Sequence, residues 1–399
     1  MSMKLGVFDT HPIQYHVPWF RYLEKRFELE VFYAHRQDGK GQASAGFGVE
    51  FDWDIPLLEG YPYRWLTNVA RHPNARSFNR FDTPEVYDLI RTGRFDAFLV
   101  FGWNYKSAIQ TIRACWQNHV PVLMRGDSHL ATKRSWVKSA LKYFPYRLLL
   151  SRLDAHLYVG QRNKAYLQHY GVPEDRLFFV PHFVDNSSFA EGARRAETEG
   201  NASKIRAELG IPRDAFVFLF VGKMIPKKRP ADFVQACSKV CSSLEGSSTH
   251  ALLVGDGPLR PSLELLAKPH AKQIHFAGFR NQTQLPAFYK ASNSLVLPSD
   301  GRETWGLVVN EAAACSIPAI VSDAVGCAPD LIDQGLTGYT YPLGDMEALA
   351  HRMLALKRMY ESNLIAIRHA LVEKIACYSI EKATEGLESA LGRLPRRST

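Results

Sequence analysis

The chain has 399 residues, of which 46% are hydrophobic and 22% charged, and its formal net charge is +9. This length exceeds what one ordinary hydrophobic core holds and predicts two domains. No apolar run approaches the ~18 residues that a membrane-spanning helix needs. The positive charge favours an anionic partner, but it does not choose among nucleic acid, acidic lipid and phosphorylated small molecules.

The N-terminus and the cysteines indicate the compartment. Asp9 and His11 interrupt the apolar run that begins at Leu5, so we expect no signal peptide there. The six cysteines are scattered without the spacing of a zinc site or a disulfide framework. Cys237 and Cys241 share a helix face, where a buried thiol pair is the simpler interpretation. A reducing, cytoplasmic setting is therefore expected.

The first half alternates apolar runs with helical patterns. Nearly continuous apolar runs are typical of parallel strands that are covered on both faces. Such strands are expected at 4–9, 28–34, 96–102, 121–125, 155–160 and 177–181. Helical periodicity fills intervals between them, as at 18–26, 84–92, 106–118 and 162–170. A doubly wound α/β domain follows from this alternation.

The second half repeats the pattern after a polar stretch at 190–203, which we interpret as a linker. Strands are expected at 216–222, 251–255, 274–277, 294–298 and 319–322, and the chain ends in an amphipathic helical segment. The fold class is thus α/β, with two doubly wound Rossmann-like domains that face a ligand-binding cleft. The expected boundaries are 1–189 for the first domain, 190–203 for the linker, 204–375 for the second domain, and 376–399 for a C-terminal helix that packs back on the first domain.

Two common phosphate-binding motifs are missing from the strand ends. The turn after the first strand, Asp9-Thr10-His11-Pro12-Ile13-Gln14, contains no glycine. The turn after 216–221, which runs from Gly222 to Lys228, matches neither G-x-G-x-x-G nor a P-loop. A Rossmann oxidoreductase is therefore not expected.

The stretch from Glu303 to Glu311 carries the strongest binding signal. It follows an apolar run and a Gly-containing turn and then opens a helix, an arrangement that aims backbone N–H groups at an anion. Lys223 and Lys228 flank a turn at the carboxyl end of another strand, where ammonium groups would meet phosphate. A solvated loop is the alternative for the lysine turn alone. Two anion sites at one crevice favour a ligand that carries phosphate.

Several short motifs follow one another in the second half of the chain. They are Gly222-Lys223 with Lys228, Gly255-Asp256-Gly257-Pro258, Gly278-Phe279, Glu303-x7-Glu311, Pro318-Ala319-Ile320-Val321-Ser322 and Gly335-Leu336-Thr337-Gly338. In this order they resemble the retaining glycosyltransferases of the GT-B fold and are most similar to family 4, the glycosyl transferases group 1. The resemblance covers residues 214–357 and, in the first half, 180–185. No single motif is specific to these enzymes, so the resemblance rests on the order and spacing of all of them.

The resemblance implies a donor site in the second domain. Lys223 and Lys228 would bind the diphosphate of a nucleotide-sugar, with a UDP- or GDP-sugar expected. Many relatives have Arg at the first position, and Lys223 keeps the charge without the bidentate fork. Glu303 would hydrogen-bond hydroxyls of the donor sugar, and Glu311 would hold those of the ribose. The remaining contacts would come from the backbone: Gly306, Leu307 and Val308 to the phosphate, and the chain near Phe279 to the base.

The implied chemistry is stabilisation of the leaving diphosphate. Lys228 and the helix start favour the transition state as negative charge builds on the phosphate, and Glu303 is not the nucleophile. No cofactor and no metal ion are expected. Asp52-Trp53-Asp54 resembles a metal-binding Asp-x-Asp motif, but it lies in the wrong domain.

The acceptor side belongs to the first domain. Relatives often place a histidine near the donor sugar from the region of Asp127 and His129, so His129 is the leading candidate for a catalytic role and Asp127 is second. Many relatives carry a glycine pair after the first strand, which this chain lacks. His11 and Gln14 are the polar candidates in that loop.

The acceptor itself is a hydroxyl compound that could be carried by a membrane. Residues 133–152 include six basic residues, no acid and several aromatics. A helix of this kind can lie on an anionic bilayer surface, here the inner face of a membrane, although a helix packed on the domain with solvated lysines gives the same pattern.

Two alternatives to a transferase remain open. One is a nucleotide-sugar epimerase of the same architecture, and the other is a nucleotide-sugar-binding module without catalysis. Nucleic-acid binding is not expected, because the basic residues do not form a known recognition module.

Overall fold

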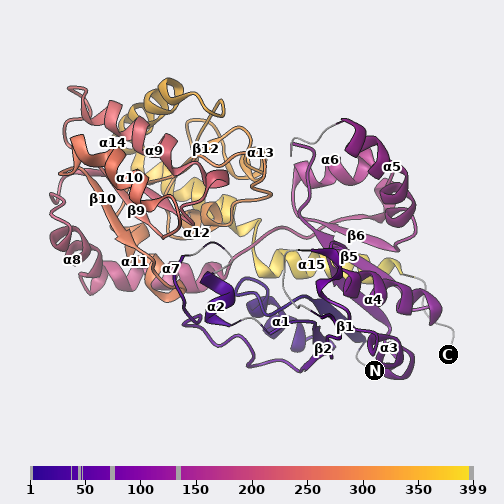
Figure 1. The fold of residues 1–399 in the computed structure, drawn as a ribbon. Coiled ribbons are helices and arrows are strands. Elements are labelled where there is room, and N and C mark those ends of the chain that lie inside the picture. Colours follow the sequence, from indigo (N-terminus) through magenta and orange to yellow (C-terminus); the bar gives the residue numbers. More distant parts are fainter. Residues whose placement is uncertain are drawn as a thin grey trace. The chain divides into compact units, whose positions relative to one another are not determined.

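The computed structural model describes residues 3–36, 38–43, 46, 48–71, 77–131 and 136–394. The chain divides into two compact units. Unit 1 consists of Met1–Gln37, Pro56–His182 and Ile380–Thr399, and unit 2 consists of Asp38–Ile55 and Phe183–Ser379. Each unit is built on a parallel sheet with helices between its strands (Figure 1).

The described part of unit 1 has a seven-stranded sheet in the order β3-β2-β1-β4-β5-β6-β7. Its strands β1, β4, β5 and β6 are largely buried, as expected for a parallel sheet between helices, whereas the edge strand β3 is mainly exposed. The strand order reverses between β1 and β4, which makes their carboxyl ends a topological switch point. The strands are β1 (Lys4–Asp9), β2 (Glu28–Tyr33), β3 (Tyr63–Trp65), β4 (Ala97–Phe101), β5 (Val122–Gly126), β6 (Ala155–Tyr158) and β7 (Leu177–Phe179).

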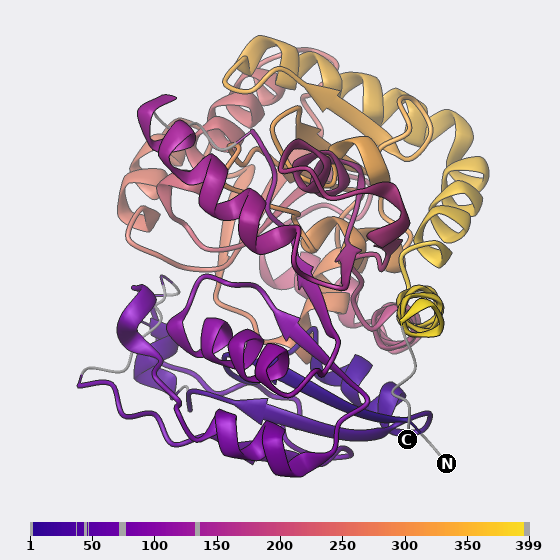
Figure 2. The ribbon, with the colours of Figure 1, turned by 90° about the vertical axis from the view of Figure 1, so that its right-hand side faces the viewer.

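Helices of unit 1 come from both ends of the chain. They are α1 (Val17–Glu24), α3 (Val86–Gly93), α4 (Lys106–Gln117), α5 (Trp136–Leu150), α6 (Gln161–His169) and α15 (Ile380–Arg393), with short 3₁₀ turns η2 (Phe78–Arg80) and η3 (Glu174–Arg176). α15 is seen nearly end-on in Figure 2 and packs against α1, β6 and β7. Trp19 donates from Nε1 to Thr384 Oγ1 at 3.0 Å. At Gly386 a Cβ atom would lie 1.9 Å from the Phe179 carbonyl oxygen, so α15 needs glycine there to approach β7.

The sheet of unit 2 has the order β10-β9-β8-β11-β12-β13, and all its strand pairs are parallel. β8, β9, β11 and β12 are buried along their whole length. Here the order reverses between β8 and β11, which places a second switch point at their carboxyl ends. The strands are β8 (Phe216–Val221), β9 (Thr249–Val254), β10 (Ile274–Gly278), β11 (Ser294–Leu297), β12 (Ala319–Ser322) and β13 (Gly338–Tyr341).

The helices of unit 2 include the stretch that the sequence suggested as a linker. Residues 190–203 lie in α7 and α8, and α7 packs on α11 and α12. Phe189, Ala193 and Ala196 are buried in that packing, a 3–4 spacing whose small alanines give little hydrophobic signal. The helices are α2 (Gly39–Gln42), α7 (Asn186–Thr198), α8 (Asn201–Glu208), α9 (Pro230–Cys241), α10 (Arg260–Ala267), α11 (Leu285–Lys290), α12 (Val308–Ala314), α13 (Ala328–Leu331) and α14 (Met346–Ala376), with 3₁₀ turns η4 (Pro226–Lys228), η5 (Lys268–His270) and η6 (Gln282–Gln284).

Candidate functional site

The turns after β8 and β11 bring opposite charges together at the switch point of unit 2. Lys228 ends η4, and its Nζ lies 2.6 Å from Oε2 of Glu303, which follows β11. The Nζ of Lys227 lies 3.9 Å from the same oxygen. The structure therefore places Lys228 and Glu303, predicted from separate motifs, in direct contact.

Glu303 is held as a carboxylate by its neighbours. It is buried, with 8% of its surface exposed. Burial by itself would raise the pKa of Glu303, but the charges of Lys228 and Lys227 outweigh it and hold that pKa below its usual range. The carboxylate is thus ionised and fixed, ready to accept hydrogen bonds from hydroxyl groups.

Lys223 is the third cation of this edge. Burial lowers the pKa of the Lys223 ammonium to about 8, and the nearby charges of Lys227 and Lys228 act in the same direction. Glu303 opposes them only in part. A buried ammonium beside two other cations is a place where an anion such as a diphosphate would be stabilised strongly.

Glycines let the turns after β8 and β9 pack backbone against backbone. A Cβ atom on Gly255 would lie 2.0 Å from the Gly222 carbonyl oxygen, and one on Gly257 would lie 2.8 Å from that of Met224. The two turns are also joined by a hydrogen bond from the Met224 N–H to the Asp256 carbonyl at 2.8 Å. The lysine turn is therefore held in place by the β9 turn.

The start of α12 is equally constrained. Gly306 has φ 101°, and a Cβ atom there would lie 2.7 Å from Leu297 Cδ2 of β11. Trp305 is buried and donates from Nε1 to Asn310 Oδ1 at 2.8 Å. The Val309 N–H bonds back to the Gly306 carbonyl at 2.9 Å, so the preceding amides of Gly306, Leu307 and Val308 belong to the helix start.

Glu311 lies one turn into α12. It is completely buried, and its Oε2 accepts a hydrogen bond of 2.7 Å from the hydroxyl of Tyr289 on α11. Phe279 directly follows β10 and is half-buried. Gly278, with φ 73°, turns the chain out of the strand just before it. The described residues thus place every predicted donor-site residue at or near the carboxyl edge of one sheet.

The Asp-x-Asp motif, which the sequence placed in the first domain, belongs to unit 2. Asp54 accepts hydrogen bonds from the Thr283 N–H at 3.2 Å and from the Thr283 hydroxyl in the first turn of η6. Among the residues that the structure describes, no cluster of three or more His, Cys, Asp or Glu side chains could hold a metal ion.

The acceptor-side candidates all belong to unit 1. Asp127 and His129 follow β5, whereas His11 and Gln14 follow β1, the strand on the other side of β4. His129 is buried, and its Nδ1 accepts a hydrogen bond of 3.1 Å from the Ala131 N–H, which leaves the proton of a neutral ring on Nε2. Burial lowers the pKa of His11.

Three further groups of unit 1 were not singled out from the sequence. His16 Nδ1 lies 2.6 Å from Asp9 Oδ2 at the end of β1. Arg125 is buried at the end of β5 and donates to the Pro181 carbonyl at 2.9 Å, and burial lowers its pKa to about 10. His182 lies 3.8 Å from Asp127, and burial lowers its pKa to about 4. A charged residue at the end of an apolar strand was the available signal for Asp9 and Arg125.

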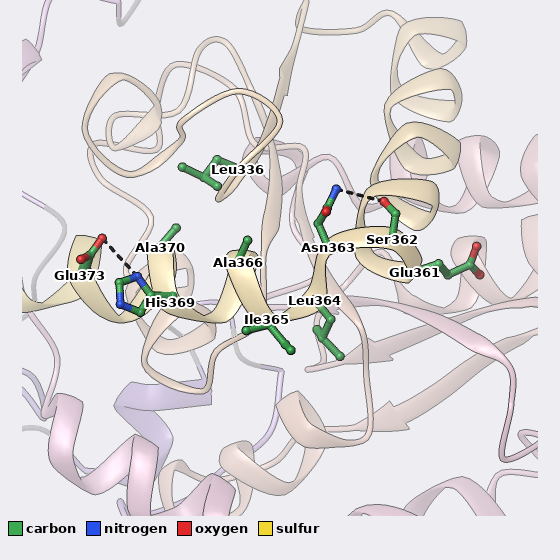
Figure 3. Close-up of a pocket in the computed structure, with 10 residues that line it drawn as sticks. All are labelled: Leu336, Glu361, Ser362, Asn363, Leu364, Ile365, Ala366, His369, Ala370 and Glu373. Carbon is green, nitrogen blue, oxygen red and sulfur yellow. Dashed lines mark hydrogen bonds and ion pairs between the residues drawn. The ribbon is translucent and has the colours of Figure 1, made fainter.

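A hollow of about 780 Å³ lies elsewhere in unit 2, at the kink of α14 (Figure 3). The kink is at Asn363, whose φ of −135° is not helical. The hollow is lined by residues such as Leu336, Ile365 and Ala366, and by the His369–Glu373 pair. None of the predicted donor residues lines it.

The second half matches a known family of proteins. Residues 201–371 match the model described as Glycosyl transferases group 1. This part of the chain is therefore similar to that family. The resemblance inferred from the ordered motifs is thereby confirmed.

Curated relatives cover part of the chain. It is 33% identical over 178 residues to the D-inositol 3-phosphate glycosyltransferase of Thermomonospora curvata, a match that covers 42% of this chain and 40% of that protein. The protein of the same name from Mycolicibacterium paratuberculosis is 29% identical over 228 residues, which are 56% of this chain and 49% of the relative. The chain thus spans about half the length of the curated relatives it matches, or less.

Solved structures match along the whole chain. The Anabaena protein Alr3699/HepE in complex with UDP has a TM-score of 0.73 at 16% identity, with 98% of this chain and 100% of that chain covered. A glycosyltransferase from Rickettsia africae has a TM-score of 0.74 at 15% identity, with coverages of 99% and 100%. The expected fold class, GT-B with two doubly wound α/β sheets, is confirmed.

Proposed function

We propose that this protein is a retaining glycosyltransferase that moves a sugar from a UDP-sugar to a hydroxyl acceptor without a metal ion. The observation that carries the proposal is the contact between Lys228 and Glu303 at the switch point of unit 2. One side of this pair attracts phosphate and the other accepts hydrogen bonds from sugar hydroxyls. A nucleotide-sugar presents both groups within a few ångströms.

The choice of UDP rests on relatives of the same fold. Alr3699/HepE was solved with UDP and with UDP-glucose. The pneumococcal O-GlcNAc transferase GtfA was solved with UDP and GlcNAc. A GDP-sugar is the second candidate, because the lysines and glutamates of this edge contact parts that both donors share.

Each donor residue has a separate task in this proposal. Lys223 and Lys228 bind the diphosphate, and Glu303 orients the sugar. The N–H groups of 306–308 meet the phosphate, while Glu311 holds the ribose and the backbone near Phe279 holds the base. The carbon–oxygen bond between sugar and phosphate breaks as the acceptor oxygen bonds to the same carbon. The acceptor's proton passes to a phosphate oxygen, so no enzyme nucleophile is needed.

The cations of this edge supply the catalytic stabilisation. Charge that develops on the leaving diphosphate meets preorganised ammonium groups in a largely buried setting, where electrostatic interactions are stronger than in water. Their total charge is the reason that a metal ion is not required in this proposal. His129 and Asp127 of unit 1 are assigned to the acceptor side.

A membrane surface is the proposed location of the acceptor. On α5, Val137, Leu141, Phe144 and Leu148 are all exposed, from 46% to 75%, and their 4-3-4 spacing forms one stripe. Tyr143 and Tyr146 of the same helix pack on the core of unit 1 instead. Exposed Lys142, Arg147 and Arg152 accompany the stripe, which suits an anionic bilayer better than a second copy of this basic chain. No helix in the described ranges is long and apolar enough to cross a membrane.

Thermal unfolding with nucleotides tests the proposal directly. A ligand at 100 times its dissociation constant adds about 2.7 kcal/mol to the free energy of unfolding. We expect UDP and a UDP-sugar to raise the Tm, and pyrophosphate to raise it less. The absence of a shift with UDP-, GDP- and ADP-sugars would contradict the donor site.

Product analysis separates the three functional classes. A transferase releases UDP slowly by hydrolysis and faster with its acceptor, whereas a binding module releases none. An epimerase releases UDP without an acceptor and leaves an altered sugar. Glu303→Ala should abolish turnover but retain UDP binding, because the carboxylate contacts the sugar and not the nucleotide.

A further inference from the structure

Residues 48–54 belong to unit 2 although they lie between β2 and β3 of unit 1 in the sequence. They follow the short α2, which is the indigo helix labelled in Figure 1. Gly48 approaches the turn after β9, since a Cβ atom on it would lie 3.3 Å from Gly257 Cα. Phe51 contacts Phe279, which follows β10. The 48–54 segment thus lies against the carboxyl edge of the donor sheet.

Two polar contacts anchor this segment to the turn that follows β10. Asn281 donates from Nδ2 to the Asp52 carbonyl at 2.7 Å. The carboxylate of Asp54 accepts from the N–H and the hydroxyl of Thr283 in η6. A carboxylate at the start of a helical turn is favoured by the unpaired N–H groups there.

An aromatic contact lies between the anchors and the strand. The rings of Phe51 and Phe279 have centroids 4.2 Å apart and planes inclined by 36°. Trp53 also contacts Phe51 edge-on, with centroids 5.0 Å apart. Such aromatic pairs stabilise the structure beyond the burial of their area. Phe279 is therefore held by a side chain from the 48–54 segment.

We propose that Phe51 is a positioning residue for the nucleobase of the donor. This inference rests on the proposed function, which assigns the base to the backbone near Phe279. Gly278 ends β10 with a positive φ, so residue 279 lies outside the sheet and is not held by strand pairing. Phe51 supplies that support, and Asp54 fixes Phe51 by anchoring the segment. The base then binds beside a Phe279 that is already held in position, so binding does not carry the entropic cost of ordering this residue.

The inference predicts a loss confined to the nucleoside half of the ligand. Isothermal titration of the full chain with UDP and with inorganic pyrophosphate separates the two halves. Phe51→Ala should weaken UDP binding about 10-fold, which corresponds to 1.4 kcal/mol, and leave pyrophosphate binding unchanged. Phe51→Tyr keeps the ring and should retain UDP binding.

A matched pair of acidic residues tests the anchor without touching the ring. Asp54→Ala removes the hydrogen bonds from Thr283 and should weaken UDP binding selectively. Glu50→Ala removes the same charge from an exposed side chain of the same segment and should bind UDP as the parent does. Circular dichroism confirms that each variant is folded. If Phe51→Ala does not fold, the Asp54 and Glu50 variants decide the question.

The outcomes distinguish this inference from the proposed function. A parent chain that binds neither UDP nor GDP overturns the proposed function and with it this role of Phe51. A parent that binds UDP, with folded Phe51→Ala and Asp54→Ala variants of equal affinity, overturns the inference alone. An equal loss of UDP and pyrophosphate binding also overturns it, because the segment would then act on the whole site.

Discussion

The ammonium of Lys228 and the carboxylate of Glu303 form a contact of 2.6 Å, with only 13% and 11% of the two side chains exposed. They come from turns after β8 and β11, which are neighbouring strands on opposite sides of the switch point. In this contact each group neutralises the charge of the other. A bound nucleotide-sugar would replace this contact, because its phosphate would pair with Lys228 and its sugar hydroxyls would donate to Glu303.

Removal of one partner should destabilise the protein, because the other is left as a buried charge without its nearest counter-charge. Lys228→Met removes the cation that lies 2.6 Å from the buried Glu303, and loss of a buried partner typically costs about 3–5 kcal/mol. We expect a clear fall in the free energy of unfolding at neutral pH, measured by denaturant unfolding. The double variant Lys228→Met/Glu303→Gln should recover most of the loss, and a double variant as unstable as the single one would contradict this account.

The contribution of Glu303 to the free energy of unfolding should change with pH in opposite directions in the parent and in Lys228→Met. In the parent the pKa of Glu303 is lowered, so its stabilisation is present above the pKa of the unfolded chain and is lost as pH falls through the folded value. In Lys228→Met burial dominates and raises that pKa. The variant should therefore gain stability relative to the parent as the pH is lowered from 7 towards 5.

Donor binding should weaken in alkaline solution because of Lys223. Its pKa is lowered to about 8 by burial and by the neighbouring lysines, and only the protonated form attracts the diphosphate. UDP affinity should fall as pH rises above about 8. Lys223→Arg should remove most of this fall, since a guanidinium stays charged. Titration calorimetry from pH 7 to pH 10 measures the difference, and parallel curves for the two proteins would refute the assignment.

The same shift affects folding with the opposite sign. An unfolded lysine has a pKa of about 10.4, so between about pH 8 and 10.4 the unfolded chain binds the additional proton. The contribution of Lys223 to the free energy of unfolding therefore rises with pH in this window. Lys223→Met should remove that rise.

Recognition of ribose should depend on Glu311. A hydrogen bond to a charged group contributes about 1.5–3 kcal/mol, so the parent should bind UDP about 10- to 100-fold more tightly than 2′,3′-dideoxy-UDP. Glu311→Gln should reduce this preference. Tyr289→Phe removes the hydroxyl that donates to Glu311 and should lower stability while the preference remains. If Glu311→Gln keeps the full preference, the ribose contact lies elsewhere.

Binding of α5 to vesicles should require its exposed stripe. Leu141 and Phe144 are 72% and 75% exposed, so Leu141→Glu and Phe144→Glu should not disturb the core. We expect both variants to lose sedimentation with vesicles of anionic lipid at low salt, because each replaces apolar contact with a repelled charge. Leu265→Glu on α10 is the control, as Leu265 is 71% exposed on another helix. Equal sedimentation of all variants would exclude this surface.

The sequence by itself determined most strands of the two sheets and placed the predicted donor residues at the edge of one of them. β8 is a run of six apolar residues, and such runs form strands wherever they are buried. Lys223, Lys228 and Glu303 could be predicted because they directly follow such runs, and parallel strands place their carboxyl ends at one edge. Their positions just after the strands in the sequence therefore predict that they lie near one another in the structure.

Only the tertiary structure decided the contacts that no local pattern encodes. β3 (Tyr63-Arg64-Trp65) and β13 (Gly338-Tyr339-Thr340-Tyr341) contain no run of aliphatic residues, and they pair because neighbouring strands offer an edge. Asp54 resembled a metal ligand, yet its partner Thr283 is 229 residues away in the chain. The 48–54 segment joined unit 2 through such contacts. Side-chain pairing over long separations depends on packing of the whole chain, whereas periodicity reports only the next few residues.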